Sequence, residues 1–146
     1  MTTFLAAQIL LTIVTLGFSL VPVLADFNAT HATNPRWTGH ARFHVVWQVC
    51  SYVALACVTL VILWIPGEAH ELRVYLAASI ALCVFLGFFA AVATRRLYGG
   101  ELADENGYQP IRMSLPGRDV AVDLNTTAFT LIVLILAGAW VLLIAN

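Results

Sequence analysis

The sequence contains no lysine, and charged side chains make up only 10% of its 146 residues. An ordinary soluble domain carries roughly 25% charged residues, so this shortage excludes a typical cytosolic globule. The same shortage excludes a disordered chain and a nucleic-acid-binding protein. The chain has three cysteines, an odd number without Cys-x-x-Cys spacing, which argues against a disulfide framework or a zinc ribbon. We expect these cysteines to be buried as small hydrophobic side chains.

Apolar residues, in contrast, dominate the chain: they make up 61% of it, and the mean hydropathy is +0.89. Four stretches of 21 or 22 residues contain no charged side chain, namely residues 4–25, 45–65, 74–94 and 124–145. A bilayer core of about 30 Å needs about 20 helical residues to cross it. The stretches are apolar on all sides, whereas membrane β-strands alternate. The sequence therefore predicts an all-α integral membrane four-helix bundle.

We expect residues 1–146 to form a single transmembrane domain, with helices over about 4–25, 35–65, 72–95 and 120–145. The first helix should be retained rather than cleaved as a signal peptide, because no basic segment precedes it. The second helix should begin near Pro35, since Asn34 is a good N-cap and proline suits the first helical position. The Gly-rich turns of residues 96–119 suggest a cytoplasmic lid over the adjacent end of the bundle.

The arginines are distributed unevenly between the two ends of the predicted bundle. Six of the seven lie in segments 26–44 and 95–123, and only Arg73 lies near the loop that joins the second and third helices. The positive-inside rule therefore places the arginine-rich segments in the cytoplasm and both termini outside. The predicted location is a bacterial inner membrane.

Each predicted helix also carries a weakly polar stripe at helical spacing. In lipid, such stripes usually turn inward, because polar groups find partners there and small residues allow close packing. We therefore expect a compact bundle with a polar centre. The stripes run along four sets of residues: Gln8, Thr12, Thr15 and Ser19; His40, His44, Gln48 and Ser51; Ser79, Cys83, Gly87, Ala90 and Thr94; Asp123, Thr127, Thr130, Ala137 and Gly138.

Residues 26–48 concentrate the reactive side chains, with three of the four histidines and two of the four tryptophans. Ionisable groups at membrane depth are costly and usually serve function. Arg36 and Trp37 are equally well explained as interfacial anchors. We predict a reactive group of Asp26, His31, His40, His44 and Asp123. We assign substrate binding to Trp37, Arg42, Trp47, Gln48 and Asn125.

Three chemistries fit this set. Histidine titrates near neutral pH and a nearby carboxylate raises its basicity, which favours a cofactor-independent and metal-independent isomerase, cyclase or epoxide-opening enzyme. Its substrate would be a hydrophobic lipid- or terpenoid-like molecule. A non-catalytic lipid- or sterol-binding protein, or a subunit of a membrane complex, is the second reading. The third is a zinc-dependent lipid hydrolase with a three-histidine site. The expected partners are membrane lipids and a hydrophobic small molecule, with homo-oligomerisation left open and no nucleic acid.

All three chemistries require the reactive side chains to meet. Asp26 and the histidines lie on either side of, or within, the turn between the first two helices, so we expect Asp26 and at least one of His31, His40 and His44 to line one pocket. The segment Asp-x-Asn-x-Thr-His-x-x-Asn-Pro-x-Trp-x-x-His-Ala-Arg-Phe-His, residues 26–44, resembles a motif in small four-helix membrane proteins of bacteria and fungi. That resemblance implies no activity, since none is assigned to those proteins. The size and plan are also similar to DoxX-like proteins and to the sterol-isomerase and sigma-2-receptor group, which handle apolar ligands.

Overall fold

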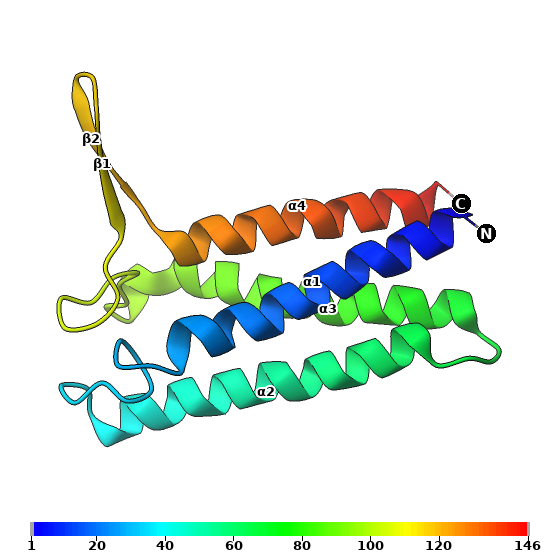
Figure 1. Ribbon diagram of the computed structural model, residues 1–146, viewed down its shortest axis with the longest axis horizontal. Coiled ribbons are helices and arrows are strands. Elements are labelled where there is room, and N and C mark those ends of the chain that lie inside the picture. The colour runs from blue at the N-terminus through cyan, green and yellow to red at the C-terminus, as the bar shows by residue number, and fades with distance from the viewer. Residues whose placement is uncertain (1, 146) are drawn as a thin grey trace.

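The computed structural model describes residues 2–145 as four long helices and one β-hairpin. The helices are α1 (Thr2–Asp26), α2 (Gly39–Trp64), α3 (His70–Thr94) and α4 (Leu124–Ile144), and all four are long and apolar enough to cross a membrane. A short 3₁₀ turn, η1 (Arg95–Leu97), follows α3. The chain ends lie at one end of the bundle, and residues 27–38 and 98–123 lie at the other, here called the loop end (Figure 1). The predicted four-helix membrane architecture is confirmed.

The start of α2 differs from the sequence-based prediction. The helix begins at Gly39, where the Thr38 hydroxyl accepts a hydrogen bond from the amide of Ala41 at 3.2 Å and acts as the N-cap. Asn34 and Pro35 lie in a turn before the helix instead. The predicted N-cap is wrong because the Asn34 side chain is used in contacts between loops, described below.

Helix α1 lies at the centre of the packing and contacts each of the other three helices. Its buried face is built from apolar side chains such as Leu11, Val14 and Phe18, and Phe18 meets Phe85 of α3 edge-to-face at 6.3 Å. Gly17 lets α4 approach closely, since a Cβ atom there would lie 2.7 Å from the side chain of Ile132. The centre of the bundle is therefore an apolar, close-packed core.

The expected polar centre is absent from the described residues because only one of the four polar stripes faces inward. Gln8, Thr15 and Ser19 of α1 are buried, whereas the stripes of the other helices lie largely on the outer surface. Hydroxyl groups on both kinds of face bond to carbonyls of their own helix: Thr15 to Leu11 at 2.7 Å, and Thr130 to Thr126 at 2.7 Å. A hydroxyl satisfied in this way needs no partner on another helix. The three cysteines are free and exposed on the outer faces rather than buried.

The third loop, residues 98–123, contains a β-hairpin that was not predicted from the sequence. Strands β1 (Ile111–Leu115) and β2 (Arg118–Val122) pair antiparallel, joined by a tight turn in which Gly117 has φ +83°. Figure 1 shows the hairpin extending sideways from the loop end, away from the helices. The predicted lid over 96–119 is therefore wrong for the hairpin residues. Segment 99–109 is the part of the third loop that packs against the first loop, residues 27–38.

Candidate functional site

The structure brings Asp26 and His31 together at the loop end. Asp26 is the last residue of α1, and the chain turns back so that the amide of Ala32 donates to the Asp26 carbonyl at 2.9 Å. This turn places His31 Nδ1 3.6 Å from Asp26 Oδ1. Both side chains are largely shielded, with 16% and 18% of their surfaces exposed. A carboxylate and an imidazole are thus adjacent in a sheltered position.

Asn28 and Thr30 set the orientation of the His31 ring. The Asn28 amide nitrogen donates to the carbonyls of Leu24 and Ala25, at 3.1 and 2.8 Å, which leaves its Oδ1 as the acceptor. That oxygen receives the Thr30 hydroxyl at 2.5 Å, and the same hydroxyl lies 2.8 Å from His31 Nδ1. A hydroxyl has one hydrogen, so Thr30 must accept from His31. The network therefore assigns the proton of neutral His31 to Nδ1 and leaves the lone pair on Nε2.

Two aromatic rings contact the imidazole of His31. Trp37 meets it edge-on with ring centroids 5.1 Å apart, and Tyr108 stacks on it at 6.4 Å with planes 28° apart. Each ring is itself anchored. Trp37 Nε1 donates to Asp104 at 3.1 Å, and the Tyr108 hydroxyl accepts from the amide of Leu124, at the start of α4, at 2.6 Å. Segments that are far apart in the sequence thus fix one side chain.

A seam between the first and third loops closes this arrangement. The Asn34 side chain is 1% exposed and donates to the carbonyls of Asn106 and Thr30, at 2.7 and 3.2 Å. Arg36 bonds to the Asn106 side chain. At Gly107 a Cβ atom would lie 2.6 Å from the Thr30 carbonyl oxygen, so this close approach requires glycine.

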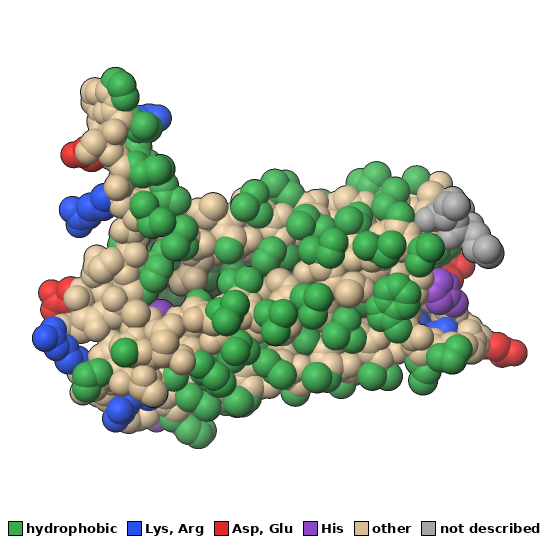
Figure 2. Space-filling model, viewed as in Figure 1, with side chains coloured by type: hydrophobic (Ala, Val, Ile, Leu, Met, Phe, Trp, Pro, Cys, Tyr) green, Lys and Arg blue, Asp and Glu red, His purple; other side chains and the backbone are tan. Residues whose placement is uncertain are grey.

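His31 stands between two cavities. The polar chamber, about 490 Å³, lies among the loops; the lateral groove, about 450 Å³, lies between the loop-end halves of α1 and α4. His31 and Tyr108 line both. Among residues 2–145, no hydrogen-bond partner is found for His31 Nε2, the nitrogen that carries the lone pair. Figure 2 shows the surface hollowed at the foot of the hairpin, on this side of the molecule.

Asp26 lines a third, smaller cavity of about 70 Å³. Its polar lining consists of Asp26, Gln48 and Asn125, and its apolar lining includes Phe88 and Phe129. The volume has room for a few water molecules, each of which occupies about 30 Å³ in the liquid. Asn125 also lines the lateral groove, so its amide lies between the two spaces.

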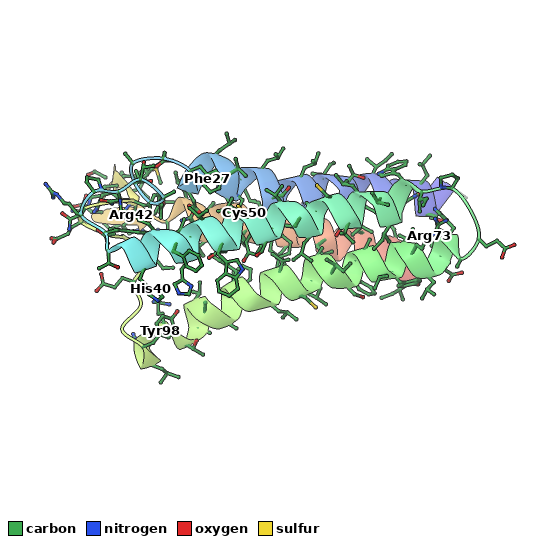
Figure 3. All side chains as sticks on the ribbon, turned by 90° about the horizontal axis from the view of Figure 1, so that it is seen from below. Phe27, His40, Arg42, Cys50, Arg73 and Tyr98 are labelled. Atoms are coloured by element: carbon green, nitrogen blue, oxygen red, sulfur yellow. The ribbon has the colours of Figure 1, made fainter. Side chains whose placement is uncertain are left out.

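His40 and His44 do not join this group, contrary to the prediction of one reactive cluster. Their Nε2 atoms lie 3.1 Å apart on an exposed face of α2, and neither residue lines the three cavities. Figure 3 shows His40 on the side of α2 near Tyr98, away from α1. The physical reason is helical periodicity: Val49, buried against the bundle, is nine residues from His40, which is roughly half a turn around the helix.

Some of the remaining predicted residues line the cavities at the loop end, and others do not. Asp123 is the N-cap of α4, where Oδ1 accepts from the amide of Thr126 at 2.6 Å, so a structural role accounts for it. Arg42 and Trp47 line none of the three cavities, and Trp47 is 59% exposed beside Phe43. Asp26, His31, Trp37, Gln48 and Asn125 are the predicted residues that surround the cavities.

No group of three or more His, Cys, Asp or Glu side chains within residues 2–145 is arranged to hold a metal ion. The three-histidine ligand set that the zinc hydrolase reading requires is therefore not assembled. Thr30, Asp104 and Tyr108 are positioning residues that were not predicted from the sequence. The Asn106-Gly107 pair marks a turn in the segment of Asp104 and Tyr108, but nothing in the sequence indicates that this segment contacts Asn34.

A family model described as "Family of unknown function (DUF6640)" matches residues 9–115, which is more than two thirds of the chain. The chain belongs to this family. The matched range includes the Asp26–His31 pair, the seam and Tyr108, and it ends with β1, before α4. No curated protein and no solved structure matches the chain.

Proposed function

We propose that this member of the DUF6640 family is a membrane-embedded acid–base enzyme in which His31 moves a proton on a lipophilic substrate. One observation carries the proposal. His31 directs Nδ1 to Thr30 and Asp26, its Nε2 has no partner among residues 2–145, and the residue lines both an apolar groove and a polar chamber. A general base needs an available lone pair, a fixed tautomer and access to substrate.

The Asp26 carboxylate would support this chemistry without reacting itself. When Nε2 takes a proton, the ring becomes an imidazolium, and a carboxylate 3.6 Å from Nδ1 stabilises that charge. In an isomerisation, Nε2 removes a proton from one carbon and returns it to another as the double bond moves. This sequence conserves atoms and electrons and needs no co-reactant. Cyclisation and epoxide opening would use the protonated ring as the acid.

The two cavities that His31 lines suggest an amphiphilic substrate. Leu24, Leu124 and Ala128 line the lateral groove, which suits a hydrocarbon chain entering from the bilayer between α1 and α4. The carboxylates of Glu101, Asp104 and Glu105 line the polar chamber. Three acidic groups disfavour an anionic head group, so we expect a neutral or cationic one.

Comparative lipid analysis of cells that produce variants of the full chain tests the proposal. The set comprises the wild type, Asp26→Asn, His31→Gln and, as a control, His70→Gln, an exposed histidine at the opposite end of the bundle. We expect the wild type and the control to convert one lipophilic species into another of equal mass, or one heavier by a water for an epoxide. His31→Gln and Asp26→Asn should slow this conversion on the order of 10²–10⁴-fold.

Two results would contradict the enzyme. If both variants still convert the lipid, His31 and Asp26 have no acid–base role. If the wild type changes no lipid, the protein does not have the proposed enzymatic activity. If wild type and Asp26→Asn instead co-purify with the same unconverted lipid, the cavities serve a non-catalytic binding protein.

We also propose that the loop end faces the cytoplasm, in a bacterial inner membrane. Six arginines lie at the loop end and Arg73 near the other, the asymmetry on which the positive-inside rule depends (Figure 2). Thr33 and Glu68 are exposed at opposite ends. A membrane-impermeant maleimide should label Glu68→Cys on intact cells, and Thr33→Cys only after permeabilisation. The reverse pattern would invert the orientation.

A further inference from the structure

The hairpin of the third loop has one apolar and one polar face. Side chains alternate along a strand, and directly paired residues share a face. Ile111 pairs with Val122, and Met113 with Val120, which builds a continuous apolar face. The opposite face carries the pairs Arg112 with Ala121 and Ser114 with Asp119. The pattern is that of a sheet with one side in water and the other against something apolar.

Nothing in the described chain provides that apolar contact. Ile111, Met113 and Leu115 are 48%, 45% and 45% exposed, and no helix among residues 2–145 packs along the strands. An isolated two-stranded hairpin is only marginally stable in water. A hairpin with this pattern therefore needs an external apolar surface.

The position of the hairpin identifies that surface. Figure 1 shows the strands roughly perpendicular to the helices, so in a membrane crossed by the helices they lie roughly in its plane. Figure 2 shows hydrophobic side chains on the side of the hairpin that faces along the helices, and Asp, Lys or Arg side chains mainly on the opposite side. The apolar face is thus turned toward the bilayer and the polar face toward water.

We propose that residues 111–122 form an interfacial anchor, with the apolar face seated in the boundary between lipid head groups and acyl chains. The surface is continuous with the lipid-facing side of α4, where Leu124 and Leu131 are 45% and 58% exposed, and only Asp123 separates β2 from that helix. Arg118 fits this position as well. It pairs with Leu115 near the tip of the apolar face, where its long side chain can reach lipid phosphates. The occupant is the bilayer itself.

Spin labels on adjacent residues test the anchor in the full chain, reconstituted in nanodiscs of phosphatidylcholine and phosphatidylglycerol. Met113→Cys and Ser114→Cys form a matched pair on opposite faces, in a background with alanine at Cys50, Cys57 and Cys83. We expect the label at 113 to collide mainly with oxygen, which is lipid-soluble, and the label at 114 with a water-soluble nickel chelate. Labels at 120 and 121 should repeat the alternation.

Two results would overturn the anchor. Equal access of the nickel chelate to both positions would place the hairpin in water. Shielding of position 113 from both reagents would indicate a protein surface, such as a second copy. If the cysteine-free chain does not fold, Met113→Trp and Ser114→Trp in the natural background replace the labels. Brominated lipid should then quench the fluorescence of the introduced tryptophan, measured as the difference from the natural protein, at least several-fold more at 113 than at 114. Equal quenching at the two positions would refute the proposal.

Discussion

Removing the Asn34 side chain should separate the two loops without disturbing the helices. In addition to its two donated bonds to Asn106 and Thr30, Asn34 accepts from the amide of Arg36 at 3.0 Å. Asn34→Ala therefore removes three hydrogen bonds at a side chain that is 1% exposed. At about 1 kcal/mol each, the loss is about 3 kcal/mol. The carbonyl groups left behind lie near the surface and can recover water, so we take this as the upper end.

The loss should appear as local opening, because none of the three bonds involves a helix: two lie within the first loop, and one joins that loop to Asn106. Within the third loop, the amide of Asp104 donates to Tyr108 at 2.9 Å and that of Gly107 donates to Asp104 at 3.0 Å. Only the bond to Asn106 crosses the seam, so the free energy of opening the seam should fall by about 1 kcal/mol, and exchange of these amides should accelerate roughly 5-fold. Hydrogen exchange followed by mass spectrometry, on protein in nanodiscs, can compare peptides over 99–109 with peptides from α3.

Two further variants sharpen the result. Thr33→Ala changes an exposed neighbour and should exchange like the wild type. Asn34→Asp keeps the oxygen that accepts from Arg36 and loses both donors, so it should open the seam as well. Unchanged exchange over 99–109 in Asn34→Ala would refute the reasoning, and equal acceleration in the helices would show that Asn34 stabilises the whole bundle.

Three other substitutions probe the same end of the molecule. Gly107→Ala forces a Cβ atom to within 2.6 Å of the Thr30 carbonyl and should open the seam by the same exchange assay, whereas Gly39→Ala meets open space and should not. Asp123→Ala removes the N-cap of α4 and should cost about 1 kcal/mol in thermal unfolding, while Asp119→Ala, whose carboxylate accepts from the exposed Ser114 hydroxyl, serves as control. Equal shifts for this pair would contradict the capping role. Trp37→Phe loses the bond to Asp104 and should cost about 1 kcal/mol, with faster exchange at Asp104 as the readout. Wild-type exchange at that residue would mean that the bond contributes nothing to the loop.

The membrane architecture and the Asp26–His31 pair were predictable because each depends on residues close together in the sequence. A span of about 20 apolar residues crosses a bilayer whatever its neighbours are. Asp26 and His31 are five residues apart in one turn, and the turn is held by Asn28 and Thr30 within the same segment. Local hydrogen bonds of this kind follow from the order of the residues.

The facing of the helices and the pairing of the loops depended on tertiary structure. His40 and His44 form as good a helical stripe as Thr15 and Ser19, yet one stripe faces outward and the other inward. Lipid is as apolar as the core, so no hydrophobic force decides which face turns inward, and packing shape decides instead. The contact of Asn34 with Asn106 spans 72 residues, and no local preference specifies it. Only the packed helices bring those two loops together, and with them the rings that hold His31.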